Sequence, residues 1–123
     1  MSGPYDPAAR HPVILDVQDT EGGREWLLHV PANLAWFAGH FPGTPVLPGV
    51  VQADWAIYYA RSLGFEPNRF RGFPRIKFKA VIRPDAVVRL SLRATHARRV
   101  DFRYASDSTL HSEGSVEYID AAR

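Results

Sequence analysis

The stretch from position 49 to 63 constrains the fold more than any other part of this chain. Up to position 60 its only polar side chains, tyrosines aside, are Gln52 and Asp54. Pro48 suits the start of a helix, and Gly64 suits its C-terminal end. At about 1.5 Å per residue this helix is roughly 22 Å long, too short to cross a membrane. Because a helix that is apolar on nearly all faces has to be buried, we expect a central helix wrapped by the rest of the chain.

The remaining segments predict a sheet around this helix. Apolar and polar residues alternate with the period of two that is typical of strands, and turn residues separate the runs. The expected strands are 13–18, 24–30, 75–82, 88–95, 99–104 and 109–119. The four strands after the helix follow one another through short turns, which predicts an antiparallel meander with one buried face. The expected fold class is therefore α+β, a curved antiparallel sheet wrapped around one long central helix.

Length and composition set the expected organisation. A chain of 123 residues with 46% hydrophobic residues is expected to form a single domain, 1–123, with a real core. Residues 1–12 are rich in proline, glycine and alanine and are expected to be flexible. We also expect Asn33 to cap a helical turn over 34–37. No apolar run resembles a signal peptide or a membrane span, so a cytoplasmic protein is expected.

Metal sites are not expected. The chain has no cysteine, which excludes disulfides and thiolate ligands. The histidines other than His40 are scattered without ligand spacing: His11, His29, His96 and His111.

Positive charge is concentrated in one part of the chain. Residues 61–103 contain 12 Lys and Arg against 3 acidic residues, although the formal net charge of the whole chain is only +2. This distribution suggests an acidic partner, such as a nucleic acid, a membrane surface, an acidic protein or a phosphorylated cofactor. A solvated sheet face would show the same pattern. No nucleic-acid-binding motif is present and the aromatic residues fall mainly on expected buried faces, so no nucleic-acid partner is expected.

The candidate reactive groups lie in the loop before the helix and in the helix itself. Three prolines stiffen the loop between His40 and the helix. His40 can act as a base near neutral pH, and burial of Asp54 would favour its protonated form, which can act as an acid. The first helical N–H groups, at Gly49 and Val50, can bind a carbonyl oxygen, and glycine would let a substrate approach closely. An isolated His and Asp are more often structural, so chemistry alone leaves both interpretations open.

A longer motif resembles a known family. The hotdog-fold 3-hydroxyacyl-[acyl carrier protein] dehydratases share the pattern Gly39-His40-Phe41-Pro42-x-x-Pro45-x-x-Pro48-Gly49-Val50, with a carboxyl at Asp54. The later run from Lys77 to Asp85 is similar to the strand and turn that follow the helix in that family. The run from Val46 to Trp55 resembles the ApeI-like branch, which is associated with aryl polyene gene clusters.

This resemblance implies a reaction and roles for individual residues. The implied activity is removal of water from a 3-hydroxyacyl thioester to give the 2-enoyl thioester, in fatty acid or aryl polyene type biosynthesis. His40 would be the base, Asp54 the acid, and the Gly49 N–H the donor to the thioester carbonyl. The other implied substrate-binding residues are Phe41, Pro48, Val50 and Tyr58. No cofactor is implied, because the substrate is carried on the phosphopantetheine of acyl carrier protein.

The resemblance also implies partners. Acyl carrier protein is acidic, which gives the basic region a candidate role. The expected contacts are Arg71, Arg75, Lys77, Lys79 and Arg83. The family builds each site across a dimer, with the histidine from one chain and the acid from the other. We therefore expect a homodimer, a heterodimer with another hotdog chain, or a higher oligomer.

Some positions depart from the family pattern, and alternatives stay open. Asp54 stands where many members have glutamate, Tyr58 where glutamine is usual, and Arg83-Pro84-Asp85 where Pro-Gly-Asp is usual. A non-catalytic hotdog subunit of a heterodimeric dehydratase and an acyl thioesterase are the alternative functions. Tyr58 and Tyr59 either line an acyl tunnel or pack in the core. The acyl chain length and the cis or trans product are not determined by the sequence.

Overall fold

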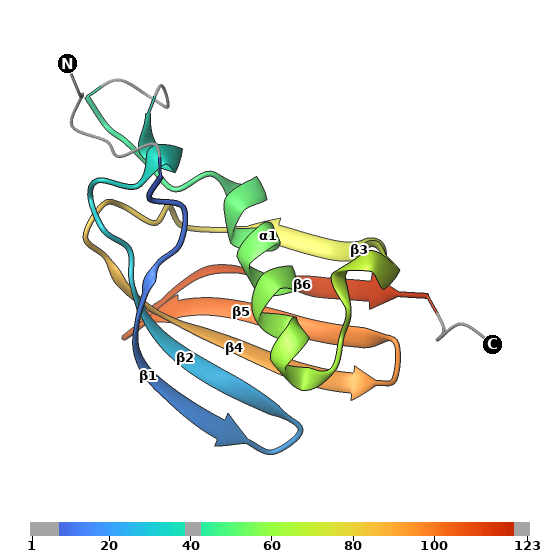
Figure 1. Cartoon of the computed structure of the whole chain (residues 1–123). Helices are drawn as coiled ribbons and strands as arrows, with labels where there is room; N and C mark the ends of the chain where they lie inside the picture. Colours follow the sequence, from blue (N-terminus) through green and yellow to red (C-terminus); the bar gives the residue numbers. More distant parts are fainter. Residues whose placement is uncertain (1–7, 39–42, 120–123) are drawn as a thin grey trace.

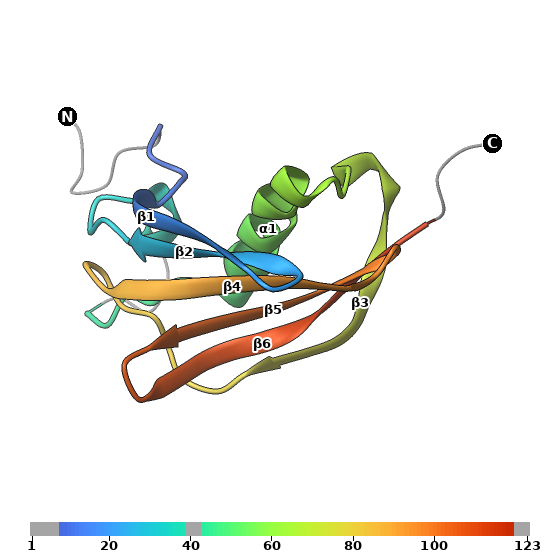
Figure 2. The same ribbon diagram turned by 90° about the horizontal axis from the view of Figure 1, so that it is seen from below.

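The architecture is one helix laid across a curved sheet. The computed structural model describes residues 8–38 and 43–119. The helix α1 spans Gly49–Ala60. The strands are β1 (Val13–Thr20), β2 (Gly23–His29), β3 (Phe70–Phe78), β4 (Val87–His96), β5 (Arg99–Ser106) and β6 (Thr109–Tyr118). Figures 1 and 2 show the sheet curving around α1, which confirms the expected α+β hotdog architecture.

The strand order corrects the expected meander. The sheet has the order β1-β2-β4-β5-β6-β3, with every neighbouring pair antiparallel. Only β4, β5 and β6 form a meander, whereas β3 lies at the far edge beside β6. In Figure 1, α1 crosses the concave face between the β1–β2 hairpin and β3. After the helix, the chain therefore enters the sheet as β3, at the edge opposite β1.

The limits of β3 also differ from the expected 75–82. The strand begins at Phe70, and the register shifts on both sides of Gly72. Bulges of this kind break the period-two alternation, and Pro74 is tolerated because β3 is an edge strand. The strand ends at Phe78, after which Ile82 is fully buried in the core. The alternation of apolar and polar residues continues past Phe78 into this loop, whose Ile82 packs in the core. The sequence therefore suggested a strand that ends at position 82.

The helix starts and ends as the sequence predicts. Pro48 is its N-cap, a 3₁₀ turn at Arg61–Leu63 continues it, and Gly64 ends it with a φ of 91°. Glycine suits that left-handed conformation because it has no Cβ. Across residues 8–38 and 43–119, no helix combines the length and the apolar character that a membrane span needs.

The expected burial of α1 on all sides is wrong for the single chain. The sheet covers only one side of the helix, and this side contributes Trp55, Ala56 and Tyr59 to the core. The opposite side forms an exposed ridge of Val50, Asp54 and Tyr58, each four residues from the next. Val50 is 75% exposed and Tyr58 42% exposed. One curved sheet can enclose no more than part of a helix, so the apolar composition of α1 exceeds what its own sheet covers.

The segment before β1 is held in place from residue 8 onward. The carbonyl of Arg10 accepts hydrogen bonds from the indole N–H groups of Trp36, at 2.8 Å, and Trp55, at 3.1 Å. Pro12 is buried. The segment 8–12 thus contacts the body of the fold, the expected flexibility of 1–12 stays a prediction, and residues 1–7 lie outside the described part.

Another expectation that fails is the helix cap at Asn33. The 3₁₀ helix at Ala35–Phe37 has Leu34 as its N-cap and no side-chain cap hydrogen bond. Its first N–H, at Ala35, instead donates to the carbonyl of Ala9, at 2.9 Å. The N-terminal segment thus supplies the acceptor that a capping side chain would have provided.

Two buried tyrosines on neighbouring strands differ in how their hydroxyls are satisfied. The hydroxyl of Tyr104 donates to the backbone carbonyl of Gln52 in α1, at 2.7 Å. Burial raises the pKa of Tyr104 well above its ordinary value, so this donor stays protonated. The hydroxyl of Tyr118 is buried without a hydrogen-bond partner in the described residues, and burial raises its pKa to about 12. A buried polar atom stabilises a fold only when it is paired.

We expect the two Tyr→Phe substitutions to have opposite effects. Tyr104→Phe removes the hydrogen bond to α1 and should lower the free energy of unfolding by about 1 kcal/mol. Tyr118→Phe removes an unpaired polar atom and should leave stability unchanged or raise it by up to about 1 kcal/mol. Denaturant unfolding of both variants measures the difference. Equal losses in the two would contradict this interpretation of the tyrosine pair.

Candidate active site

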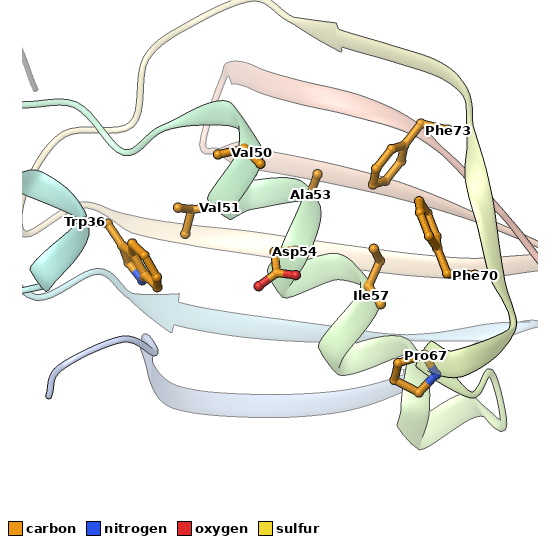
Figure 3. Close-up of a pocket in the computed structure, with 9 residues that line it drawn as sticks. All are labelled: Trp36, Val50, Val51, Ala53, Asp54, Ile57, Pro67, Phe70 and Phe73. Atoms are coloured by element: carbon orange, nitrogen blue, oxygen red, sulfur yellow. The ribbon is translucent and has the colours of Figure 1, made fainter.

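Asp54 lies in the middle of the exposed ridge of α1, between two hollows. Trp36, Ile57 and Pro67 line both. The first hollow has a volume of about 510 Å³ and is apolar, with Val50, Val51, Ala53, Phe70 and Phe73 among its lining residues. Figure 3 shows Asp54 between Trp36 on one side and the rings of Phe70 and Phe73 on the other. The site thus combines one carboxyl with an apolar surface built from α1 and β3.

The second hollow is smaller and carries positive charge. Its volume is about 360 Å³, and besides Asp54 it is lined by Arg10, His11, Trp55, Tyr58 and Arg61. The Arg10 guanidinium lies 5.1 Å from the centre of the Trp36 ring, and that of Arg61 lies 4.6 Å from the centre of the Tyr58 ring. Sequence reasoning missed both arginines. Arg61 follows Asp54 by seven residues, or two helical turns, which is a signal that could have found it. Arg10 is distant in sequence and gave no such signal.

The carboxyl of Asp54 does not meet the expectation of a buried acid within one chain. Its side chain is exposed, and no hydrogen bond or ion pair among the described residues involves its carboxylate. The reason is its place on the ridge of α1 that the sheet leaves uncovered. Any desolvation of this group has to come from a substrate or a second chain.

The start of α1 leaves two N–H groups available. The N–H groups of Val51 and Gln52 both donate to the carbonyl of Pro48, at 3.1 and 3.2 Å. The N–H groups of Gly49 and Val50 have no acceptor among the described residues, as expected for the first turn of a helix. They lie in a groove of about 510 Å³ formed by Val46–Val50 with Gln52 and residues 78–81.

Packing favours glycine at position 49. A Cβ at this position would lie 2.6 Å from Cζ and 2.7 Å from Cε1 of Phe78. The space where a side chain would point is therefore filled by the Phe78 ring, which is itself 52% exposed. Close approach of a substrate to the Gly49 N–H stays a prediction. Phe78 is the last residue of β3, so its position beside Gly49 depends on where that strand ends.

The remaining substrate-binding candidates are divided by the structure. His40 and Phe41 lie outside the described residues. Tyr58 is exposed in the second hollow, where its ring lies 4.9 Å from that of His11. Tyr59 instead belongs to the core, and burial, followed by the neighbouring Tyr58, raises its pKa to about 12. Tyr59 thus packs in the core, whereas a place for Tyr58 along an acyl tunnel stays a prediction.

The basic residues expected to contact a carrier protein lie on β3 and in the turn after it. All five are exposed. Three of them have acidic neighbours on β6: Arg71 lies 3.7 Å from Glu117, and Arg75 and Lys79 lie 3.9 and 3.8 Å from Glu113. Within the described residues, Lys77 and Arg83 form no ion pair. Most of this positive charge is thus partly balanced on the sheet surface, as the solvated-face interpretation predicts.

The described residues contain no cluster of three or more His, Asp or Glu side chains arranged to bind a metal. His111, which gave no signal in the sequence, has a structural position instead. Its ring Nε2 lies 2.6 Å from the Ser106 hydroxyl, and its Nδ1 lies 3.1 Å from the carbonyl of Val81. The backbone N–H groups of Lys79 and Ala80 donate to its carbonyl. His111 therefore fixes the loop that forms one wall of the groove at Gly49.

Comparisons with known proteins agree on one type of enzyme. The family model "ApeI-like: ApeI dehydratase" matches residues 16–115. A 3-hydroxyacyl-[acyl-carrier-protein] dehydratase FabZ from Bacillus pumilus is 33% identical, over 88% of this chain and 83% of that protein. The FabZ of Alkaliphilus metalliredigens is 36% identical over 58% of this chain, and the match spans about half of that protein, 53%.

A solved structure gives the same result. The dehydratase heterocomplex ApeI:P from Xenorhabdus doucetiae superposes with a TM-score of 0.77 at 27% identity. The superposition covers 87% of this chain and 96% of that chain. The similarity therefore extends over the helix and the sheet together and is not limited to the motif around Asp54.

The contact between Gly49 and Phe78 gives a test by paired substitutions. We expect Gly49→Ala to lower the free energy of unfolding by about 1–2 kcal/mol, because the added methyl forces the Phe78 ring to move. In a Phe78→Ala background the same change should cost nothing or stabilise, since alanine favours helices over glycine. Denaturant unfolding of the four chains gives both values. The same cost in both backgrounds would show that the ring is not the reason for glycine.

Proposed function

The chain belongs to the ApeI-like dehydratase family, and from this premise we propose that it removes water from a 3-hydroxyacyl thioester on acyl carrier protein. The product is the 2-enoyl thioester. The observation that carries the proposal is the position of Asp54, a carboxyl with no hydrogen bond or ion pair among the described residues, on the exposed ridge of α1 between two hollows. An acid in this position can act on the hydroxyl of an acyl chain that lies along the aromatic side chains of the first hollow.

The proposed reaction uses three groups. His40 takes the proton from C2 of the acyl chain, and Asp54 gives its proton to the C3 hydroxyl. The C2–H and C3–O bonds break, the C2–C3 double bond forms, and water leaves. Charge that develops on the thioester oxygen is stabilised by the free N–H groups of Gly49 and Val50. Transfer of the proton from His40 back to Asp54 then restores the starting state.

A second chain is part of this proposal. The ridge of Val50, Asp54 and Tyr58 exposes two large apolar side chains beside the candidate acid. A partner packed on the ridge would bury Asp54, which favours the protonated carboxyl that the reaction needs. The partner is a second copy of this chain or another hotdog chain. The similarity to one chain of the ApeI:P heterocomplex supports the second possibility as much as the first. The pathway we propose is fatty acid or aryl polyene type biosynthesis.

The reaction can be followed by the mass of the acyl group. We expect the purified chain, alone or with a second hotdog chain, to convert 3-hydroxyacyl-carrier protein with loss of the mass of one water. Asp54→Asn and His40→Ala should each lower the rate by about 100-fold or more, since each removes a proton-transfer group. Release of the free acid would indicate a thioesterase instead. Full activity of a pair in which only this chain lacks both groups would indicate a non-catalytic subunit.

Contact of the five basic residues with the carrier protein stays part of the proposal. The sharpest test substitutes Lys77 and Arg83, the two that form no ion pair within the described residues. Lys77→Gln with Arg83→Gln should lower kcat/KM for carrier-bound substrate by about threefold to tenfold at low salt. Turnover of a small soluble thioester should be unchanged. Arg93→Gln with Arg103→Gln is the matched control, because both are exposed arginines without an ion pair in the described residues. An equal loss on both substrates would refute the contact.

A further inference from the structure

Gln52 is a buried polar residue on a helix that is otherwise almost apolar. It is only 3% exposed. Both ends of its amide are hydrogen-bonded: its Oε1 accepts from the Ser112 hydroxyl at 2.7 Å, and its Nε2 donates to the carbonyl of Leu47 at 3.3 Å. Its backbone carbonyl accepts the Tyr104 hydroxyl. One residue of α1 thus contacts β5, β6 and the loop before the helix through polar bonds.

Gln52 and Asp54 point in nearly opposite directions. Residues two apart on an α-helix are separated by about 200° around its axis. Gln52 lies on the side that faces the sheet, and Asp54 lies on the exposed ridge. Any rotation of α1 that moves Asp54 away from the junction of the hollows therefore also pulls the Gln52 amide away from Ser112.

Apolar packing alone favours one rotation of α1 about its axis only weakly over others. The exposed ridge carries Val50 and Tyr58, and Ile57 beside it is half-buried, so another face of α1 is also apolar enough to be buried. A buried amide discriminates more strongly, because an unpaired one costs about 1–3 kcal/mol. Single buried polar residues fix the register of coiled coils in the same way.

The same amide also holds the loop that joins the motif to the helix. Leu47 is 3% exposed, its N–H donates to the carbonyl of Ile82 at 2.8 Å, and its carbonyl accepts from Gln52. Pro48 and Gly49 follow directly. The Gln52 side chain thus fixes two things at once: the orientation of Asp54, and that of the Gly49 and Val50 N–H groups, which have no acceptor among the described residues.

We propose that Gln52 is a positioning residue that fixes the rotation of α1 and the path of residues 47–49. It thereby aims Asp54 outward and holds the first N–H groups of the helix in the groove. Its consequence for catalysis rests on the proposed dehydratase function. Its consequence for the structure does not, and the two can be tested separately.

The structural consequence can be measured with an introduced thiol, because the chain has no cysteine of its own. Asp54→Cys places the thiol on the exposed ridge, and Ala56→Cys places it on the fully buried side of α1. With Gln52 present, the thiol at position 56 should react slowly with a soluble disulfide reagent, and the thiol at position 54 should react faster in the chain without a partner on the ridge. In a Gln52→Leu/Ser112→Ala background, the buried thiol should react about tenfold faster or more, since other rotations become populated. Unchanged rates at both positions would overturn the proposal.

The catalytic consequence uses the same paired background. Gln52→Leu alone leaves the Ser112 hydroxyl unpaired, whereas adding Ser112→Ala removes that group and should return the melting temperature to within about 5 °C of the parent. The stable pair should still lose about 100-fold in kcat with little change in KM, because a displacement of about 1 Å costs that much. Ser91→Ala is the control, since this hydroxyl donates to Glu25 at 3.0 Å, away from α1. A stable pair with the kcat of the parent would refute the catalytic role.

The two proposals fail in distinguishable ways. If the unaltered chain shows no dehydration, alone or with a second hotdog chain, the proposed function is wrong, and the thiol rates still decide whether Gln52 positions the helix. If dehydration occurs and the thiol rates and kcat are both unchanged in the paired background, the function stands and the positioning role is wrong.

Discussion

The structure depends on one mismatch between a helix and a sheet. α1 carries apolar residues around most of its circumference, but a single curved sheet covers only one side of it. The uncovered side keeps Val50 at 75% exposure and presents Asp54 between two hollows. Exposed apolar surface beside a carboxyl is costly for an isolated chain and useful for one that binds a partner or an acyl substrate there. The candidate site exists because the fold leaves this side of the helix open.

Polar contacts determine how the helix sits in its sheet. The amide of Gln52 bonds to Ser112 and Leu47, and the indole N–H groups of Trp36 and Trp55 converge on the carbonyl of Arg10. The bonds from Gln52 to Ser112 and from Trp55 to Arg10 join α1 to segments far away in sequence, and the bond to Leu47 fixes the loop before the helix. Apolar burial supplies most of the stabilising free energy but has little direction, whereas hydrogen bonds have strict geometry. The site therefore depends on a few buried polar groups that contribute modestly to stability.

A count of charged residues along the sequence does not show which of them lie next to one another in the fold. The excess of Lys and Arg in 61–103 suggested an acidic partner or a solvated sheet face, and β6 places Glu113 and Glu117 beside three of the basic residues of β3 and its turn. Arg10 and Arg61, the two arginines that line the second hollow with Asp54, come from distant parts of the chain and lie over aromatic rings. Which charges balance one another depends on strand pairing, and β3 pairs with β6 rather than with a neighbour in sequence.

The sequence by itself determined the helix, its two ends, five of the strands to within about two residues, and the motif that identifies the family. These features follow from local rules: proline and glycine act at single positions, and strand alternation repeats over neighbouring residues. Only the tertiary structure decided that β3 moves to the far edge, that Asp54 is exposed, that Phe78 fills the space beside Gly49, and that Arg10 joins the site. Each of these depends on which distant segments meet. The residue pattern of one segment does not tell which of its faces another segment will cover.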